Sequence, residues 1–390
     1  MNVGIVCYAS MGGSGIVATE LGKALADRGH EVHVISADQP FRLTGFHPGL
    51  TLHRVQTPSY PLFREPQYLL SVANTIVQVT REQRLQIVHA HYAVPHAAAA
   101  VLARQVLAAT HPADEVPAVV TTLHGTDITI VGADQSFSEI VAYSIEQSDG
   151  VTAVSESLRE ATQTQLAVRH TIAVIPNFLD CAEYERREIP GLRRRYGGSD
   201  GQARIVVHVS NFRPVKRIDS VLEVFARISA AVPATLLLVG DGPEVPMARR
   251  LAQRLGIDKR IHWLGAQETV LPLLSIADLF LLPSAQESFG LAAMEAMACE
   301  VPVVASNAGG LPEVIEDGVT GFLHPVGDVE AMSRSSIALL RDPAFHASIA
   351  AAAARSVRER FCVDRVVPLY EALYERVLTS QRRPAVTDGR

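Results

Sequence analysis

Short β-rich runs alternate with longer helix-length segments along the whole chain. In the first half, six runs rich in valine, isoleucine and alanine are predicted strands: 2–8, 31–37, 86–91, 118–124, 150–155 and 171–177. Helical stretches lie between them, such as 16–28, 68–83, 95–109 and 137–147. Near-continuous apolar runs are typical of parallel strands that are buried on both faces. The pattern therefore predicts a βαβ series that forms a doubly wound sheet.

The same alternation starts again in the second half of the chain. Pro176 to Phe178 end the first series and Pro190-Gly191 break the chain again, so the charged stretch between them is a predicted linker. Six further strands are predicted at 203–211, 234–242, 260–266, 278–284, 301–306 and 320–326. Helical runs include 220–231, 245–255, 329–341 and 363–378, and the polar tail beyond Gln381 is expected to be disordered. We expect an α/β protein with two Rossmann-like domains, 1–178 and 179–362, facing a central cleft.

Composition and charge narrow the function classes. A chain of 390 residues is long enough for two full cores. Its net charge is −6 and its basic residues are dispersed, which disfavours a nucleic-acid binder. No apolar run has the length of a membrane span, and the N-terminus enters a strand without the basic segment of a signal peptide. The four cysteines lack metal or redox spacing and are expected to be reduced, mostly buried thiols of a cytoplasmic protein.

Ligands of open α/β sheets bind at the carboxyl ends of the strands. Candidate binding residues are therefore expected in the exit loops, which follow each strand directly. In the second series, Arg213 and Lys216 follow a strand and precede a helix, as a diphosphate clamp would. Read alone, the pair is equally compatible with solvated loop charges. The turn 240–244 follows the next strand, and backbone groups at 265–267 could read the edge of a base. The glycine pair at 309–310 fits a helix–strand contact as well as a ligand contact.

The segment PSAQESFGLAAMEAM, residues 283–297, carries two carboxylates eight residues apart. Glu287 lies at a strand-to-helix turn, a helix is predicted to begin near residues 288–290, and Glu295 lies within that helix. The free amides of the first helical turn can bind an anion, and the helix dipole favours one there. Carboxylates accept hydrogen bonds from hydroxyl groups. The segment can therefore hold a phosphate and two hydroxyl-bearing rings, as binding of a sugar nucleotide requires. No acidic D-x-D pair ends a strand, so no metal is expected.

The exit loops of the first series are rich in glycine and histidine. Residues 10–15 read SMGGSG and open a helix, but their spacing is not the dinucleotide pattern G-x-G-x-x-G. His89 and His91 flank a single residue and are not expected to face the same way as a chelating pair. His124 is followed by Gly125, which leaves space beside it, and Thr126 and Asp127 add a hydroxyl and a carboxylate. We expect His124 to be functional, and Asp127 to be a structural hydrogen-bonding group rather than a nucleophile.

These motifs together resemble the retaining glycosyltransferases of family four, which have the GT-B fold. The resemblance rests on E-x7-E at Glu287 and Glu295, the Arg213/Lys216 loop and the GDGPE turn, and it covers nearly the whole chain. N-terminal strings narrow it to the branch that transfers N-acetylglucosamine from UDP-GlcNAc to the 2-hydroxyl of L-malate in bacillithiol biosynthesis. These strings include CYASMGGSGIVATELGKALA, PFRL, HAHYAVPHA and VTTLHGTDITIVG.

The resemblance implies roles for individual residues. Donor-binding residues would be Gly13, Ser210, Asn211, Arg213, Lys216, Gly265, Gln267, Glu287, Ser288, Phe289, Gly290, Leu291 and Glu295. Among these, Glu295 would bind the ribose and Glu287 the 3-hydroxyl of the sugar. His124, Glu287, Arg213 and Lys216 would serve catalysis, without a metal or other cofactor. The final helix, 363–380, would pack back on the first domain.

The acceptor would be bound by Ser14, Tyr92, Thr126 and Arg42. Malate has two carboxylates that need cations or several donors, which Arg42, Arg64 or the helix start at Gly15 would supply. Rival acceptors are an inositol phosphate and a growing polysaccharide. A UDP-GlcNAc 2-epimerase, which needs no acceptor, and a non-catalytic sugar-nucleotide binder are the alternatives outside the transferases. The sequence does not indicate the oligomeric state, and a homo-oligomer is one of the possibilities.

Overall fold

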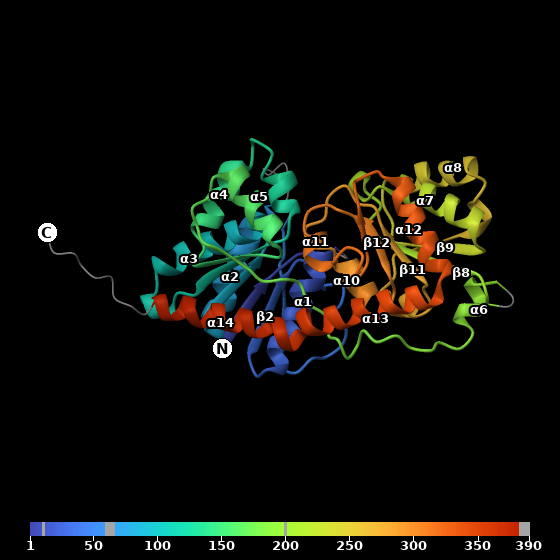
Figure 1. Ribbon diagram of the computed structural model, residues 1–390. Coiled ribbons are helices and arrows are strands. Elements are labelled where there is room, and N and C mark those ends of the chain that lie inside the picture. Colours follow the sequence, from blue (N-terminus) through green and yellow to red (C-terminus); the bar gives the residue numbers. More distant parts are fainter. Residues whose placement is uncertain (10–11, 59–66, 199–200, 382–390) are drawn as a thin grey trace. The chain divides into compact units, whose positions relative to one another are not determined.

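The computed structural model describes residues 1–9, 12–58, 67–198 and 201–381, and Figure 1 shows its elements. The chain divides into two compact units. Unit 1 comprises Met1–Asn177 and Asp364–Arg390, and unit 2 comprises Phe178–Val363. The tail beyond residue 381, which was expected to be disordered, lies outside the described residues.

Unit 1 is built on a seven-stranded parallel sheet with the strand order β3-β2-β1-β4-β5-β6-β7. Its strands are β1 (Asn2–Val6), β2 (Glu31–Ser36), β3 (Leu50–Arg54), β4 (Ile87–His91), β5 (Ala118–Leu123), β6 (Gly150–Ala153) and β7 (Ile172–Val174). The strand order reverses direction between β1 and β4, and right-handed crossovers then place helices on both faces. The main helices are α1 (Gly13–Asp27), α2 (Tyr68–Gln83), α3 (Ala98–Ala108), α4 (Ser138–Glu146), α5 (Glu156–Leu166) and α14 (Val363–Gln381).

Unit 2 repeats the plan with a six-stranded parallel sheet in the order β10-β9-β8-β11-β12-β13. Its strands are β8 (Arg204–Val209), β9 (Ala234–Val239), β10 (Ile261–Gly265), β11 (Leu279–Leu282), β12 (Val303–Ser306) and β13 (Phe322–His324). Its helices are α6 (Leu192–Tyr196), α7 (Ile218–Ala231), α8 (Val245–Arg254), α9 (Leu271–Ser275), α10 (Leu291–Ala298), α11 (Leu311–Val314), α12 (Val329–Arg341) and α13 (Pro343–Arg360). The prediction of two doubly wound α/β domains is confirmed.

The twelve predicted strands all form, and the additional strand is β3. Its burial alternates weakly and none of its residues is fully buried, because it lies at the edge of the sheet. An edge strand lacks the continuous apolar run that marks central strands of a parallel sheet. The apolar runs that were predicted as strands do form the core, where Ile5, Ile87, Leu236 and Phe280 are fully buried.

The last helix belongs to unit 1. Tyr374 on α14 is fully buried and its hydroxyl lies 2.7 Å from Nδ1 of His89 on β4. A side chain at Gly150 on β6 would meet Val377 at 3.0 Å, so glycine permits close approach of the helix. Glu371 binds Arg28 through two hydrogen bonds of 2.9 and 2.8 Å. These contacts hold α14 on the sheet of unit 1.

The cysteines correct one expectation. Cys181 and Cys362 form a disulfide across 181 residues of sequence, with Cα atoms 5.4 Å apart. The prediction of reduced thiols is wrong for this pair, because residues so distant in sequence give no local signal of pairing. Cys7 and Cys299 are free and buried, and burial raises the pKa of each to about 12.

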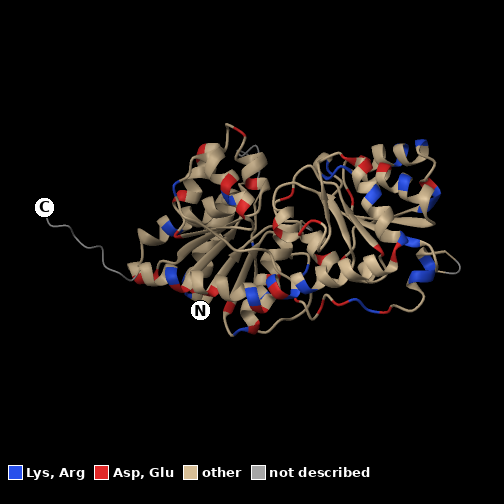
Figure 2. Ribbon diagram, in the orientation of Figure 1, with Lys and Arg blue, Asp and Glu red and all other residues tan. Residues whose placement is uncertain are grey.

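Charges are interspersed over the helices of each unit rather than gathered by sign (Figure 2). The most basic stretch is α6, with Arg193, Arg194 and Arg195. No helix in the described ranges is long and apolar enough to span a membrane.

Candidate functional site

In unit 2, the candidate donor residues gather where the strand order reverses. β8 and β11 are neighbours in the sheet, although about seventy residues separate them in the chain. The loop after β8 carries Arg213 and Lys216, and the loop after β11 carries Glu287. Ligands of doubly wound sheets bind at such a switch point, outside the carboxyl ends of the strands. The fold therefore brings the cations and the first carboxylate of E-x7-E together.

Lys216 and Glu287 are in direct contact. Nζ of Lys216 lies 2.6 Å from Oε1 of Glu287, and the hydroxyl of Ser284 donates to the same oxygen at 2.8 Å. In the described part of the chain, the other carboxylate oxygen of Glu287 has no such partner and remains able to accept from a hydroxyl group. Arg213 is exposed on the loop after β8, which also carries Lys216. The arrangement places an ammonium group against a fixed carboxylate, with an exposed arginine three residues before Lys216 on the loop after β8.

The loop between β8 and Arg213 is shaped by His208. Its Nδ1 lies 2.8 Å from the carbonyl oxygen of Leu281 and its Nε2 lies 2.8 Å from Oγ of Ser210. A carbonyl oxygen only accepts, so Nδ1 donates and Nε2 accepts from the Ser210 hydroxyl. Ser210 in turn accepts from the backbone N–H of Phe212 at 3.2 Å. Burial lowers the pKa of His208 to about 4, so this ring is neutral near neutral pH.

Glycines let the loops of this site approach one another. A Cβ atom at Gly240 would lie 1.8 Å from the carbonyl oxygen of Ser210, and one at Gly242 would lie 2.0 Å from that of Asn211. A Cβ atom at Gly309 would lie 1.9 Å from the carbonyl oxygen of Glu287. Backbone atoms cannot approach so closely, so these positions require glycine. The glycine pair at 309–310 thus makes a backbone contact with the Glu287 loop.

Helix α10 begins one residue after Gly290, which has φ 98° and allows the turn into the helix. Ser288 and Leu291 are partly exposed, whereas Phe289 is buried with its ring edge-on to Phe361 at 5.5 Å. Phe289 can therefore offer a ligand its backbone but not its ring. Glu295 lies in the helix, 5% exposed, and Oε1 accepts from the hydroxyl of Tyr184 at 2.7 Å.

The loop after β10 is open to solvent. Gly265 and Gln267 are both exposed, and the Gln267 amide donates to the carbonyl oxygen of Leu264. Gly265 accepts from the backbone N–H of Gly240 at 2.8 Å, which joins this loop to the one after β9.

In unit 1, the predicted residues follow three neighbouring strands. Gly13 and Ser14 start α1 after β1, Tyr92 follows β4 and His124 follows β5. Tyr92 has φ 87°, which is unusual for a residue other than glycine, and its ring lies 5.3 Å from that of His124. Such backbone outliers cluster at functional sites. The carboxyl edge of this sheet therefore holds a second group of candidate residues.

Three histidines of this edge form one group, in which His89 and His91 are fully buried and His124 is partly buried. The rings of His89 and His91 are 4.5 Å apart, so the expectation that they face different ways is wrong. Residues i and i+2 of a strand point to the same face. Nδ1 of His91 lies 2.9 Å from Nε2 of His124. Burial lowers the pKa of His89 and of His124 to about 3, so both rings are neutral. Among the described residues, no three potential ligands are arranged to hold a metal ion.

Asp127 ties two exit loops together. Its Oδ1 accepts from the backbone N–H groups of His124 and Gly125 at 3.2 and 2.9 Å, and its Oδ2 accepts from that of Ala93 at 3.1 Å. The residue is 1% exposed, and burial raises its pKa to about 6. These bonds agree with the structural role expected for it.

The remaining acceptor candidates differ in exposure. Thr126 is exposed and Arg42 is partly exposed. Arg64, which was considered for a malate carboxylate, lies outside the described residues.

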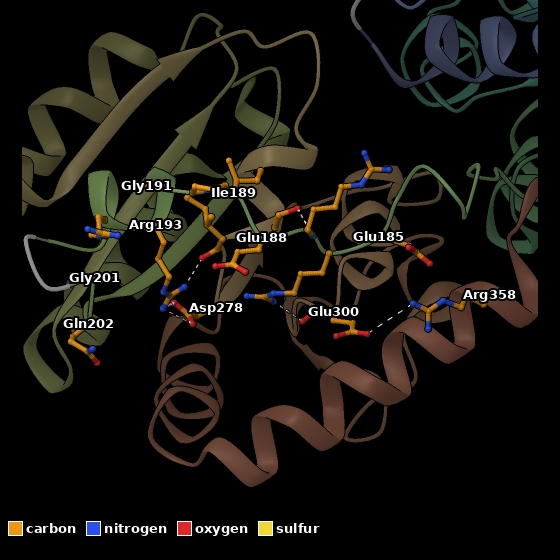
Figure 3. A pocket seen from close by; sticks show the side chains of 16 residues that line it. Glu185, Glu188, Ile189, Gly191, Arg193, Gly201, Gln202, Asp278, Glu300 and Arg358 are labelled. Carbon is orange, nitrogen blue, oxygen red and sulfur yellow. Dashed lines mark hydrogen bonds and ion pairs between the residues drawn. The ribbon is translucent and has the colours of Figure 1, made fainter.

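A pocket of about 970 Å³ in unit 2 lies away from these groups (Figure 3). Its lining includes residues 185–191, Arg193 and Arg194, together with Ser275, Ile276 and Asp278, which come just before β11. It therefore lies at the amino ends of the strands, opposite to the edge that carries Arg213 and Glu287. Two of its arginines bind the protein: Arg193 donates to Asp278 at 2.9 Å, and Arg186 donates to the carbonyl oxygen of Ala277 at 3.0 Å.

Sequence reasoning missed Ser284 and Tyr184. Ser284 precedes Glu287 by three residues in the quoted segment, so its contact had a local signal. Tyr184 is 111 residues from Glu295 and lies in the predicted linker, where nothing in the sequence pattern indicated a contact.

Both units match family models of glycosyltransferases. Residues 11–183 match the family model of Glycosyltransferase Family 4, and residues 193–356 match that of Glycosyl transferases group 1. The chain is 44% identical to the N-acetyl-alpha-D-glucosaminyl L-malate synthase of Bacillus anthracis over 98% of both chains. It is 37% identical to a D-inositol 3-phosphate glycosyltransferase of Mycolicibacterium paratuberculosis, over 46% of this chain and 42% of that protein.

Solved structures share the fold. The sucrose-phosphate synthase of Thermosynechococcus elongatus matches with a TM-score of 0.78 and 22% identity, over 97% of this chain and 100% of that one. The Anabaena HepE protein in complex with UDP and glucose matches with a TM-score of 0.75 and 22% identity, over 96% and 99%. At this level of identity the likeness concerns the fold alone.

Proposed function

Since the chain belongs to the family 4 glycosyltransferases of GT-B fold, we propose that it transfers N-acetylglucosamine from UDP-GlcNAc to the 2-hydroxyl of L-malate, with retention of the α configuration. The observation that supports this best is the 44% identity over 98% of both chains to a protein of that name. The reaction would be the first step of bacillithiol biosynthesis. In this proposal, unit 2 binds the donor and residues of unit 1 bind the acceptor.

The donor is held by charge and by hydroxyl acceptors. Arg213, Lys216 and the amides at the start of α10 face the negative charge of the diphosphate. Glu295 accepts from the ribose, and the second oxygen of Glu287 accepts from the 3-hydroxyl of the sugar. Because Ser284 and Lys216 already hold the first oxygen, the carboxylate is oriented before the donor arrives. Such preorganisation reduces the ordering cost of binding.

Departure of UDP places negative charge on the β-phosphate. Arg213, Lys216 and the helix amides stabilise that charge, which is the kind of interaction that lowers a barrier most. The leaving phosphate accepts the proton of the attacking hydroxyl on the same face of the sugar. A carboxylate nucleophile is the alternative route to retention. Asp127 is a poor candidate for it, because its oxygens accept three backbone hydrogen bonds.

His124 and its neighbours are the residues of unit 1 that have roles in the proposal. The neutral ring of His124 would contact the transferred sugar as a hydrogen-bonding group without adding charge. Ser14, Tyr92, Thr126 and Arg42 would bind the acceptor, with Gly13 near the donor phosphates. No step is assigned to a metal, since the cations of unit 2 meet the charge of the diphosphate.

An acceptor screen tests the proposal. The purified protein with UDP-GlcNAc and excess EDTA should release UDP rapidly when L-malate is added, and mass spectrometry should find the glycoside. Succinate, which lacks the 2-hydroxyl, is the matched control and should give none. Equal release with an inositol phosphate, or none with malate, would contradict the acceptor. Rapid release of UDP without any acceptor would favour the 2-epimerase.

A further inference from the structure

The hydrogen bond between Tyr184 and Glu295 joins the segment after the unit boundary to the donor site. We propose that Tyr184 is a positioning residue, which holds the Glu295 carboxylate in place for the hydroxyl groups of the nucleotide ribose. The bond is 2.7 Å long, and both side chains are 5% exposed. The inference rests on the proposed function, because it takes Glu295 as the ribose ligand.

A hydrogen bond from Tyr184 both stabilises and orders Glu295. The Glu295 side chain has three rotatable bonds. Its neighbours in the sequence of α10 are alanine and methionine, which offer no side-chain hydrogen-bond donors. A buried carboxylate without hydrogen-bond donors is costly, and a mobile one would lose entropy when the ribose binds. The phenol of Tyr184 supplies a donor on a rigid ring with two rotatable bonds. It holds one oxygen of the carboxylate and so restricts the orientations in which the carboxylate meets the ribose hydroxyl groups.

The segment that carries Tyr184 is fastened on its amino-terminal side. The backbone N–H of Leu179 donates to Phe361 at 2.9 Å, and that of Val363 donates to Leu179 at 2.8 Å. Two residues later, the disulfide joins Cys181 to Cys362. The backbone N–H of Tyr184 donates to the carbonyl oxygen of Asp180 at 3.1 Å, which closes a helical turn. These bonds fix the backbone up to Tyr184.

The same segment is fastened on its carboxyl-terminal side. The guanidinium of Arg186 donates to the carbonyl oxygens of Ala277 and Glu300 at 3.0 and 3.3 Å. Arg193 binds the carbonyl oxygen of Ile276 at 2.8 Å and the carboxylate of Asp278, and Figure 3 shows the latter contact. The side chains of Arg186 and Arg193 thus hold the segment against the rest of unit 2. With both sides anchored, the Tyr184 ring has a defined position relative to Glu295.

A ribose-specific measurement tests this role. Calorimetric Kd values of UDP and of 2′-deoxy-UDP give a discrimination ratio, expected to be about tenfold for the native protein because one hydrogen bond to a charged group is lost. Tyr184→Phe should reduce the ratio to about threefold, since Glu295 is present but less ordered. Glu295→Gln should reduce it at least as far.

Tyr374→Phe is the matched control. It removes another buried phenol that makes a 2.7 Å hydrogen bond, in unit 1, and it should leave the ratio as in the native protein. A native-like ratio in Tyr184→Phe, with a reduced ratio in Glu295→Gln, overturns the inference while the proposed function stands. A protein that fails to bind UDP at all contradicts the proposed function itself. An equal loss of affinity for both nucleotides in Tyr184→Phe would show a merely structural role and also overturns the inference.

Discussion

Replacement of Gly309 by alanine should damage the proposed donor site without replacing any residue that is proposed to bind the donor. Gly309 has φ +55°, and a Cβ atom there would lie 1.9 Å from the carbonyl oxygen of Glu287. The neighbouring N–H of Gly310 donates to the same oxygen at 2.9 Å. The added methyl group must therefore displace the backbone that carries the Glu287 carboxylate.

The size of the effect follows from two separate terms. Alanine in the left-handed region costs roughly 1–2 kcal/mol of stability wherever it occurs. Contacts of a Cβ atom below 3.0 Å are essentially never seen, so the Glu287 loop must move by about 3.0 − 1.9 ≈ 1.1 Å. A displacement of about 1 Å at a catalytic group can reduce the rate roughly 100-fold, or about 2.7 kcal/mol in kcat/KM.

Gly318→Ala separates the two terms. Gly318 has φ +74°, but an added Cβ atom would meet nothing within 4 Å. Both variants should therefore lose stability by the backbone term, a few degrees in the Tm of unit 2 at ~2–4 °C per kcal/mol. Only Gly309→Ala should lose transferase activity, measured as UDP release with UDP-GlcNAc and L-malate. Native kcat/KM in Gly309→Ala, or equal losses in both variants, would refute the reasoning.

Three further predictions address the clamp, the buried histidines and the thiols. Arg213→Ala should weaken UDP binding by roughly 1.5–3 kcal/mol in calorimetry, whereas Arg254→Ala, on the exposed surface of α8, should not; unchanged affinity would exclude Arg213 from the clamp. His89, His96 and His124 have pKa values lowered by burial to about 3 to 4, so unfolding takes up protons below pH 6.5. The contribution of these rings to the free energy of unfolding should therefore be fully present above pH 6.5. It should fall as the pH drops towards 5, by up to roughly 1.4 kcal/mol per pH unit for each ring. A Tm that stays constant from pH 7 to 5 would contradict this. Thiol titration in denaturant should find two groups, Cys7 and Cys299, and four after reduction; four before reduction would rule out the disulfide.

The E-x7-E segment shows which structural features a short stretch of sequence can predict. The sequence predicted a buried strand followed by a turn, with Glu287 at the turn and Glu295 in a helix. This was possible because each of these elements is encoded within a few residues. The start of α10 at Leu291 lies within three residues of the predicted position. Hydrophobic periodicity likewise predicted the central strands, because continuous apolar runs mark strands buried on both faces. It missed β3, whose partly exposed edge position leaves no such run.

Contacts between distant segments were decided by the tertiary structure. Lys216 meets Glu287 across 71 residues, Tyr184 meets Glu295 across 111 and Cys181 meets Cys362 across 181. Such pairs depend on the order in which strands join a sheet and on the loops that their carboxyl ends bring together. No short window of sequence contains that information.

The sequence by itself thus determined the fold class, and it indicated the exit loops and the residue types that are proposed to bind a sugar nucleotide. Those features depend on the local physics of strands, turns and helix ends. The tertiary structure decided which groups hold those residues in place: Ser284 and Lys216 at Glu287, Tyr184 at Glu295, and Gly309 beneath the Glu287 loop. The reason is that orientation of a side chain is set by its neighbours in space, and these come from other parts of the chain.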